Sequence, residues 1–148
     1  MILEDLICTN IMQRGVGNVN AQKMCKCIME LERIYGIKKG NNQHDSLRDN
    51  LISSKTQENL AETIGITPRQ LQDYKKLNDL IPELQSLVES GSMKATVGYK
   101  IWAKMPQDEQ EKFFNEIGRD KIKSLTQKAT EEYIWLYTNI LKYVNIIL

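Results

Sequence analysis

The chain has 148 residues, 41% of them hydrophobic and 26% charged, and its formal net charge is +1. This length and composition indicate one domain, or one domain with an appendage, with enough apolar residues to form a core. Proteins that bind nucleic acid mainly through excess positive charge are strongly basic, so this balance argues against a simple polyanion binder. Basic residues outnumber acidic ones in the first third, which leaves room for a local basic face.

The cysteines and the lack of long apolar runs indicate in which cellular compartment the protein is expected. Cys8, Cys25 and Cys27 are odd in number and include C-x-C spacing, which suits neither a disulfide framework nor a zinc site, so we expect reduced, packed thiols. Glu4 and Asp5 interrupt any secretory signal, and no apolar run is long enough to cross a membrane. We therefore expect a cytoplasmic protein that has no membrane partner.

Residues 1–36 form the first predicted segment. Leu3 to Met12 suits a helix or a strand, and residues 14–18 indicate a glycine-containing loop. Asn20 then suits the N-cap of a helix that Gly36 ends. Helical spacing predicts that the apolar face of this helix is formed by Met24, Ile28, Leu31 and Tyr35.

Residues 37–54 are polar, and we expect a mobile loop with a short turn at Leu47–Leu51. His44, the only histidine, has no metal or nucleophile partner in the sequence, so we expect it to be exposed in that loop. Ser54 with Gln57 three residues later would form a capping box for the next helix, and Thr56 is the rival N-cap.

The stretch from Thr56 to Leu77 predicts two short helices joined by a tight turn. Gly65 suits the left-handed end of the first helix, whereas Thr67 caps the second and Pro68 occupies its first position. The apolar positions that hold the pair together are Leu60, Ala61, Ile64, Ile66, Leu71 and Tyr74. This spacing is typical of a DNA-binding helix-turn-helix, although a bare helical hairpin uses similar elements.

Further helices follow at intervals marked by glycine and proline. We expect one from Pro82 to Gly91, one from Ala95 to Lys104 and one from Pro106 to Gly118. The fold class is therefore all-α, a multi-helix bundle built around the helix-turn-helix. Residues 55–118 are predicted to form the DNA-binding domain.

Residues 119–148 are predicted to form a long C-terminal amphipathic helix, most clearly from Thr126 onward. Alternating spacings of four and three residues indicate a heptad seam at Ala129, Tyr133, Leu136, Ile140, Tyr143 and Ile147. This seam must be buried, either by packing on its own domain or by pairing with a second copy. A homodimer would suit a two-fold DNA site.

The order of these segments resembles the ParB-like partition family of bacterial chromosomes, plasmids and mobile elements. The resemblance covers roughly residues 7 to 118, and its strongest part is K-T-Q-E-N-L-A-E-T-I-G-I-T-P-R-Q-L-Q-D-Y-K-K-L-N-D-L-I-P-E-L-Q-S-L-V-E-S-G. It implies sequence-specific binding of double-stranded DNA, association with the nucleoid or a plasmid, and a partition ATPase as partner.

The resemblance also bears on nucleotide binding. The N-I-M-Q-R run at residues 10–14 resembles the family's E-N-x-Q-R segment, and residues 18–21 resemble its N-P-x-E run. Since the family's segment helps to bind the phosphates of CTP, the resemblance makes Asn10 and Arg14 nucleotide-binding candidates. The family's G-E-R-R-x-R-A segment, which completes the pocket, is absent. We expect no cofactor, with CTP as the alternative, and no enzyme, because no catalytic constellation is visible.

The DNA-reading residues are predicted on the second helix of the helix-turn-helix, which we expect to span Pro68 to Asn78. Its exposed positions are Arg69, Gln70, Gln72, Asp73 and Lys76. Arginine suits a guanine edge and glutamine an adenine edge, so Arg69 and Gln72 are the main candidates for base readout. Asp73 would orient Arg69 or accept from cytosine. Thr67 and Gln57 suit phosphate contacts, and Lys55 and Lys75 add charge.

Two other functions are consistent with the same residues. A helix-turn-helix alone also serves a transcriptional repressor of a mobile element. Alternatively, the chain is a protein-interaction module that uses its C-terminal helix.

Overall fold

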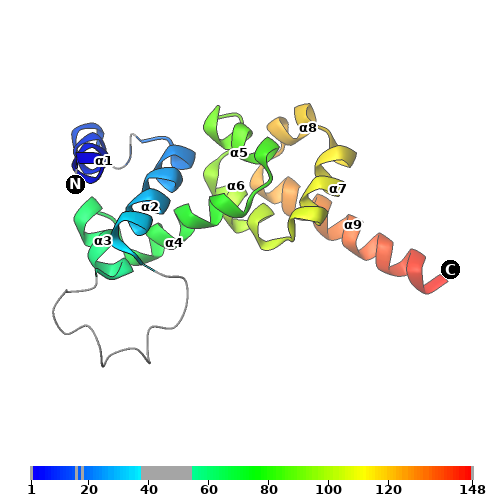
Figure 1. Ribbon diagram of the computed structural model, residues 1–148. Coiled ribbons are helices and arrows are strands. Elements are labelled where there is room, and N and C mark those ends of the chain that lie inside the picture. The colour runs from blue at the N-terminus through cyan, green and yellow to red at the C-terminus, as the bar shows by residue number, and fades with distance from the viewer. Residues whose placement is uncertain (1, 16, 18, 38–54, 148) are drawn as a thin grey trace, which may run out of the picture. The chain divides into compact units, whose positions relative to one another are not determined.

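The chain is all-α, as predicted, in a computed structural model that describes residues 2–15, 17, 19–37 and 55–147 (Figure 1). These residues contain nine α-helices and no strand. They form two compact units, Met1–Lys75 and Lys76–Leu148. This division differs from the expected one, because the N-terminal segment joins the helix-turn-helix and residues 119–148 join the helices that precede them.

The first unit contains four helices. They are α1 (Ile2–Arg14), α2 (Ala21–Tyr35), α3 (Gln57–Ile64) and α4 (Pro68–Lys76), the last of which runs to the unit boundary. The ambiguous Leu3–Met12 stretch is helical. One shared core joins the four helices, made of Ile11, Met24, Ile28, Leu31, Leu60, Ala61, Ile64, Ile66 and Leu71. The two helices of the helix-turn-helix, α3 and α4, therefore pack against α1 and α2 through this core.

The ends of α2 confirm the predicted caps. The Asn20 side chain accepts from the backbone N–H groups of Gln22 and Lys23, and Gly36 adopts the left-handed conformation with φ 66°. Ile37 packs against the core rather than beginning a polar loop. The rest of that expected loop, with His44, the Leu47–Leu51 turn and Ser54, lies outside the described residues.

The second unit begins at Lys76, the last residue of α4, and continues into a 3₁₀ turn, η2 (Leu77–Asp79). Because this turn follows Lys76, α4 does not continue to Asn78 as expected. Four α-helices and one further 3₁₀ turn complete the part before the last helix: α5 (Pro82–Glu89), α6 (Ala95–Lys100), η3 (Trp102–Lys104), α7 (Gln107–Ile117) and α8 (Arg119–Ser124). The expected single helix at 95–104 is thus divided. The division falls at Ile101, which ends α6 with φ −118° and ψ −68°. Met105 precedes Pro106 and is extended (ψ 147°), so η3 stops before it.

A buried glutamine joins three parts of the second unit. The Gln110 side chain on α7 is fully buried, and its Oε1 accepts from the backbone N–H of Ile81 at 3.0 Å. Its Nε2 donates to the carbonyls of Asp79 and Met105 at 3.1 and 3.0 Å. These bonds satisfy backbone groups at the end of η2, the start of α5 and the end of η3.

Residues 119–148 are not one helix, because Leu125 is extended (ψ 132°) and separates α8 from α9 (Gln127–Ile147). Thr126 caps α9 by accepting from the N–H of Ala129. The first half of α9 packs through Thr130, which is buried, and through Tyr137, whose ring lies 4.7 Å from that of Phe113.

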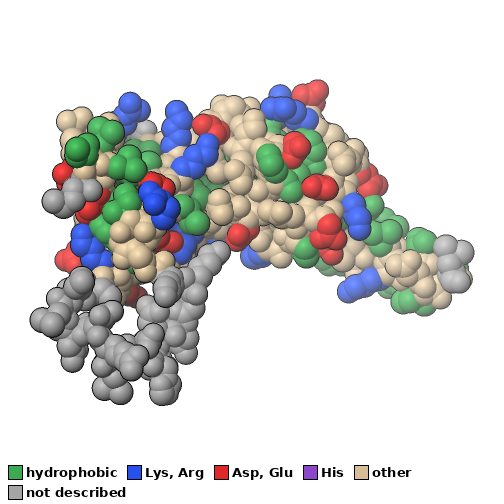
Figure 2. Space-filling view, in the orientation of Figure 1, with side chains coloured by type: hydrophobic (Ala, Val, Ile, Leu, Met, Phe, Trp, Pro, Cys, Tyr) green, Lys and Arg blue, Asp and Glu red, His purple; other side chains and the backbone are tan. Residues whose placement is uncertain are grey.

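The predicted heptad seam lies on a different side of α9. Its later members are exposed, with Ile140 58% and Ile147 80% accessible. Figure 2 shows hydrophobic side chains on the visible surface of α9 toward its C-terminal end. The later part of the seam therefore does not pack back on its own unit, whereas Thr130 and Tyr137 on a neighbouring face of the same helix do. Near the start of α9, the seam residue Tyr133 contacts Lys121 of α8. Among the described helices, none combines the length and apolarity that a membrane span requires.

Candidate nucleic-acid interface

The turn between α3 and α4 is fixed by backbone hydrogen bonds. Gly65 is left-handed with φ 76°, and its N–H donates to the carbonyl of Glu62 at 3.1 Å. The N–H of Ile66 donates to the carbonyl of Ala61 at 3.0 Å, which completes a Schellman motif. The Ile66 side chain is buried in the core. The sequence therefore sets the direction in which α4 leaves the turn, as predicted.

Both helices of the motif begin with a reciprocal capping box. Thr56 accepts from the N–H of Asn59 through Oγ1, and the Asn59 side chain accepts from the N–H of Thr56. The expected box of Ser54 with Gln57 is wrong, because Thr56 is the N-cap of α3. At α4, Thr67 Oγ1 accepts from the Gln70 N–H at 3.1 Å, and Gln70 Oε1 accepts from the Thr67 N–H at 2.9 Å.

This second box assigns local roles to two predicted DNA contacts. The backbone N–H and hydroxyl of Thr67 are engaged by Gln70, so neither side chain is a free contact group at the start of α4. Gln70 also lies away from the other predicted readout residues around the helix. Fewer residues of α4 therefore remain as candidates for DNA contact than the sequence predicts.

Four predicted readout residues lie on one side of α4, with the i, i+3, i+4, i+7 spacing of a single helix face. We call this set the α4 stripe: Arg69, Gln72, Asp73 and Lys76. Arg69, Gln72 and Lys76 are exposed, and Asp73 is half-buried. The opposite side of α4 buries Leu71 and Lys75. The stripe carries two cations, one carboxylate and one amide on a helix held by the core.

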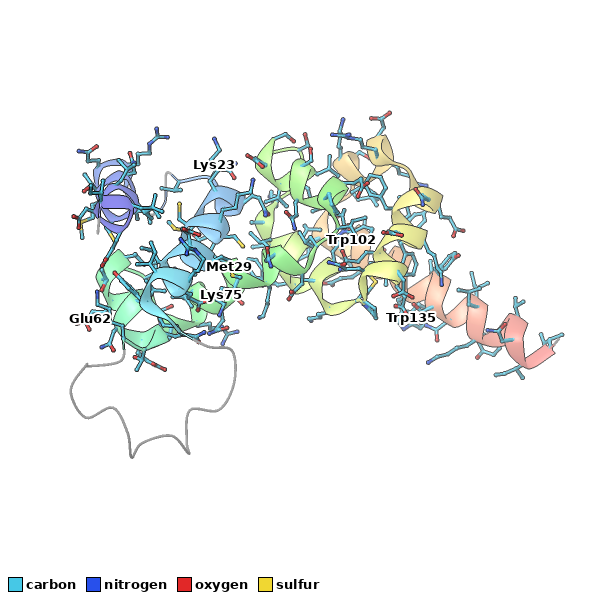
Figure 3. All side chains as sticks on the ribbon, in the orientation of Figure 1. Lys23, Met29, Glu62, Lys75, Trp102 and Trp135 are labelled. Atoms are coloured by element: carbon cyan, nitrogen blue, oxygen red, sulfur yellow. The ribbon has the colours of Figure 1, made fainter. Side chains whose placement is uncertain are left out.

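Lys75 does not add charge to the surface, which corrects the sequence-based expectation. Its ammonium lies 2.7 Å from Oε1 of Glu32 on α2, and both side chains are only 8% exposed. Figure 3 labels Lys75 on α4. The ion pair joins α4 to α2 inside the first unit. Lys75 thus supports the helix from its buried side and is not part of its exposed side.

A hydrogen-bonded chain extends from this ion pair to the stripe. Gln57, half-buried at the first position of α3, donates from Nε2 to Glu32 Oε1 at 2.9 Å. Gln57 Oε1 in turn accepts from Nε2 of Gln72 at 2.5 Å. The two glutamines predicted separately as a backbone contact and a base contact are therefore in direct contact.

Lys55 is held by α1 and α2. Its ammonium lies 3.2 Å from Oε1 of Glu4 and 3.8 Å from the centre of the Tyr35 ring, while the Tyr35 hydroxyl donates to the same carboxylate oxygen. The hydrogen bond from Tyr35, and then that from Lys55, lower the pKa of Glu4. Burial and the Glu4 carboxylate raise the pKa of Tyr35. The cluster anchors Lys55, two residues before α3, and about half of the Lys55 side chain remains accessible.

The two nucleotide candidates lie on α1. Asn10 and Arg14 are exposed one helical turn apart, and Asn10 Nδ2 donates to the carbonyl of Leu6 at 2.9 Å. Arg14 is the last residue of the helix instead of the first residue of a loop, and Gly15 follows with φ 73°. Asn18, part of the second resembling run, lies outside the described residues.

The cysteines are free thiols, as expected, with Cys25 buried and Cys8 and Cys27 half-buried. Burial raises the pKa of Cys8 and of Cys27, which favours the unreactive thiol. Within the part of the chain that the structure describes, no three His, Cys, Asp or Glu side chains gather into a metal-binding group.

The sequence-based prediction missed the Glu32–Lys75 pair, although the positions of the two residues in the sequence contain a signal for it. Lys75 follows Leu71 by four residues and Glu32 follows Ile28 by four, so both fall on apolar helix faces. Opposite charges at two core positions indicate a buried pair, but only the packing of α2 on α4 shows that they meet.

The structure gives the geometry of the candidate interface, and comparison with known proteins finds no relative of this chain. A scan against protein-family models, a search of curated proteins and a search of solved structures each return no match, so the ParB-like resemblance stays a prediction.

Proposed function

We propose that this chain binds double-stranded DNA in a sequence-specific manner, with α4 in the major groove. The observation that supports it is the α4 stripe: Arg69 and Gln72 are exposed side by side on a helix whose other side is fixed by Leu71 and the Glu32–Lys75 pair. Arg can donate two hydrogen bonds to a guanine edge, and Gln matches the donor and acceptor of adenine.

The cellular role we propose follows from the family resemblance. A ParB-like partition function would place the chain in the cytoplasm on a nucleoid or plasmid, with a partition ATPase as partner. A transcriptional repressor of a mobile element is the alternative with the same DNA-binding part. We assign neither a cofactor nor a catalytic step, because the G-E-R-R-x-R-A segment that completes the family's nucleotide pocket is absent.

Selection of bound sequences from a random duplex pool tests DNA binding directly. The wild-type chain should enrich a defined site. Arg69→Ala should lose about 1–3 kcal/mol of discrimination at one base pair, because a bidentate arginine contact carries about that much. Arg119→Ala, an exposed arginine at the start of α8, is the matched control. An enriched site that is unchanged in Arg69→Ala would show that the α4 stripe does not read the bases.

The exposed seam of α9 favours a second candidate function, self-association. Ile140, Tyr143 and Ile147 carry no charge, follow heptad spacing and lie outside the packed side of the helix. The occupant we propose is a second copy of this chain, since such a seam is self-complementary and a two-fold protein suits a palindromic site. This self-association would also serve an interaction module that does not bind DNA.

Sedimentation equilibrium separates these candidates. Wild-type chain should show a dimer mass that Ile140→Glu reduces to the monomer mass, whereas Asn145→Glu, exposed off the seam on α9, should leave the dimer intact. A monomer at all accessible concentrations would remove self-association and leave DNA binding to be judged by the selection experiment.

A further inference from the structure

We infer that Gln57 determines specificity by positioning Gln72: it fixes the side-chain amide of Gln72 so that this residue accepts adenine and rejects guanine. The inference deepens the proposed DNA binding and rests on it. Gln57 itself does not read a base in this scheme. It acts through the amide to which it is hydrogen-bonded.

The anchor of the arrangement is the buried carboxylate of Glu32. It is 8% exposed and lies 2.7 Å from the Lys75 ammonium, so its oxygens act as hydrogen-bond acceptors. Gln57 Nε2 lies 2.9 Å from Oε1 of this carboxylate. If the Gln57 amide were reversed, its carbonyl oxygen would face the carboxylate, and two acceptors would repel each other. The charge of Glu32 therefore sets which end of the Gln57 amide points inward.

The orientation passes from Gln57 to Gln72. With Nε2 turned toward Glu32, Gln57 Oε1 faces α4, where it accepts from Gln72 Nε2 at 2.5 Å. A carbonyl oxygen can only accept, so the group that Gln72 offers to it must be an N–H. The amide of Gln72 is thus ordered before any ligand arrives.

This order limits what Gln72 can present to a base. One of its two N–H groups is bonded to Gln57, which leaves one N–H and the carbonyl oxygen. Adenine offers the N7 acceptor and the N6 amino donor in the major groove, a complement to that pair. Guanine offers two acceptors, N7 and O6, and would need two donors from the same amide. The Gln57 contact removes the second donor.

The experiment compares base preference in the full chain and its variants. Selection from a random duplex pool, followed by binding to single-base variants of the enriched site, is performed on wild type, Gln72→Ala and Gln57→Met. Gln72→Ala identifies the base pair that Gln72 reads. Wild type should prefer adenine to guanine there by about 5- to 150-fold, the equivalent of one good bidentate contact. Gln57→Met should reduce that preference to a few-fold while discrimination at the other base pairs stays the same.

Matched controls separate positioning from structure. Gln107→Met places the same change at an exposed glutamine on α7 and should behave as wild type. Thermal unfolding checks that Gln57→Met is folded, and Gln57→Asn, too short to span both partners, replaces it if it is not. A general loss of stability would weaken binding to every site alike and would not alter preference at one base pair.

The outcomes are distinct. A wild-type chain that enriches no sequence refutes the proposed function and this inference with it. An enriched site in which Gln72 reads no adenine, or in which Gln57→Met keeps the full adenine preference, refutes the role of Gln57 alone. Loss of preference confined to the base pair of Gln72 supports the inference.

Discussion

Replacement of Lys75 by methionine should strongly destabilise the first unit. The change removes the ammonium that lies 2.7 Å from Glu32 and leaves a carboxylate that is 8% exposed and accepts a hydrogen bond from Gln57 Nε2 at 2.9 Å. Breaking a buried pair by removing one partner costs about 3–5 kcal/mol, since the remaining charge stays out of water. A unit the size of Met1–Lys75 has roughly 4–11 kcal/mol of stability in total, so this loss is a large share of it.

Urea unfolding followed by circular dichroism measures the effect. Lys23→Met, the same change at an exposed lysine of α2, should stay within about 0.5 kcal/mol of wild type. The double variant Glu32→Leu with Lys75→Met should recover most of the loss, because replacing both charges by apolar groups is often neutral. A Lys75→Met loss below about 1 kcal/mol, or a double variant less stable than the single one, would refute the reasoning.

Three further changes test other contacts by the same measurement. Gly98→Val should destabilise the second unit by about 1–3 kcal/mol, because even a Cβ there would lie 3.0 Å from a Leu77 methyl and 3.2 Å from a Leu80 methyl; unchanged stability would contradict so close a contact. Gln110→Leu should cost about 1–3 kcal/mol, since the buried Ile81 N–H loses its acceptor; Gln107→Leu on the exposed side of α7 is its control. Tyr35→Phe should reduce stability above pH 4.5, the ordinary pKa of Glu4, because the folded state lowers that pKa. The stabilisation is lost as pH falls through the lowered folded pKa, so the two chains should converge in acid, and a difference that grows in acid would contradict the assignment.

The helix boundaries were predictable where a single residue determines them. Gly65, Thr67 and Pro68 fix the turn of the helix-turn-helix through a left-handed backbone, a cap and a restricted φ, all local properties. The same holds for Asn20 and Gly36 around α2. Boundaries without such a residue were missed: Ile101 ends α6 with no glycine or proline of its own, and Leu125 separates α8 from α9.

The site was predictable in outline and not in its contacts. Helical spacing places Arg69 and Gln72 on an outer face, because position around a helix depends on sequence alone. Whether Gln72 meets Gln57, or Lys75 meets Glu32, depends on how α4 packs on α2 and α3. Spacing likewise identified the seam of α9, but which side of that helix packs on its unit is set by partners such as Phe113 on another helix.

The two capping boxes have a consequence for how binding should respond to ionic strength. Because Thr56 and Thr67 satisfy amides at both helix starts from within the chain, phosphate contacts would depend on charged side chains. With Arg69 assigned to a base edge, the predicted contact residues leave two cations for phosphate, Lys55 and Lys76. Two neutralised phosphates give a logarithmic salt slope of about −1.8 per copy, or about a 12-fold loss between 50 and 200 mM. Recognition by this chain would then depend more on base edges than on counterion release, and it would persist at salt concentrations that dissociate strongly basic DNA-binding proteins.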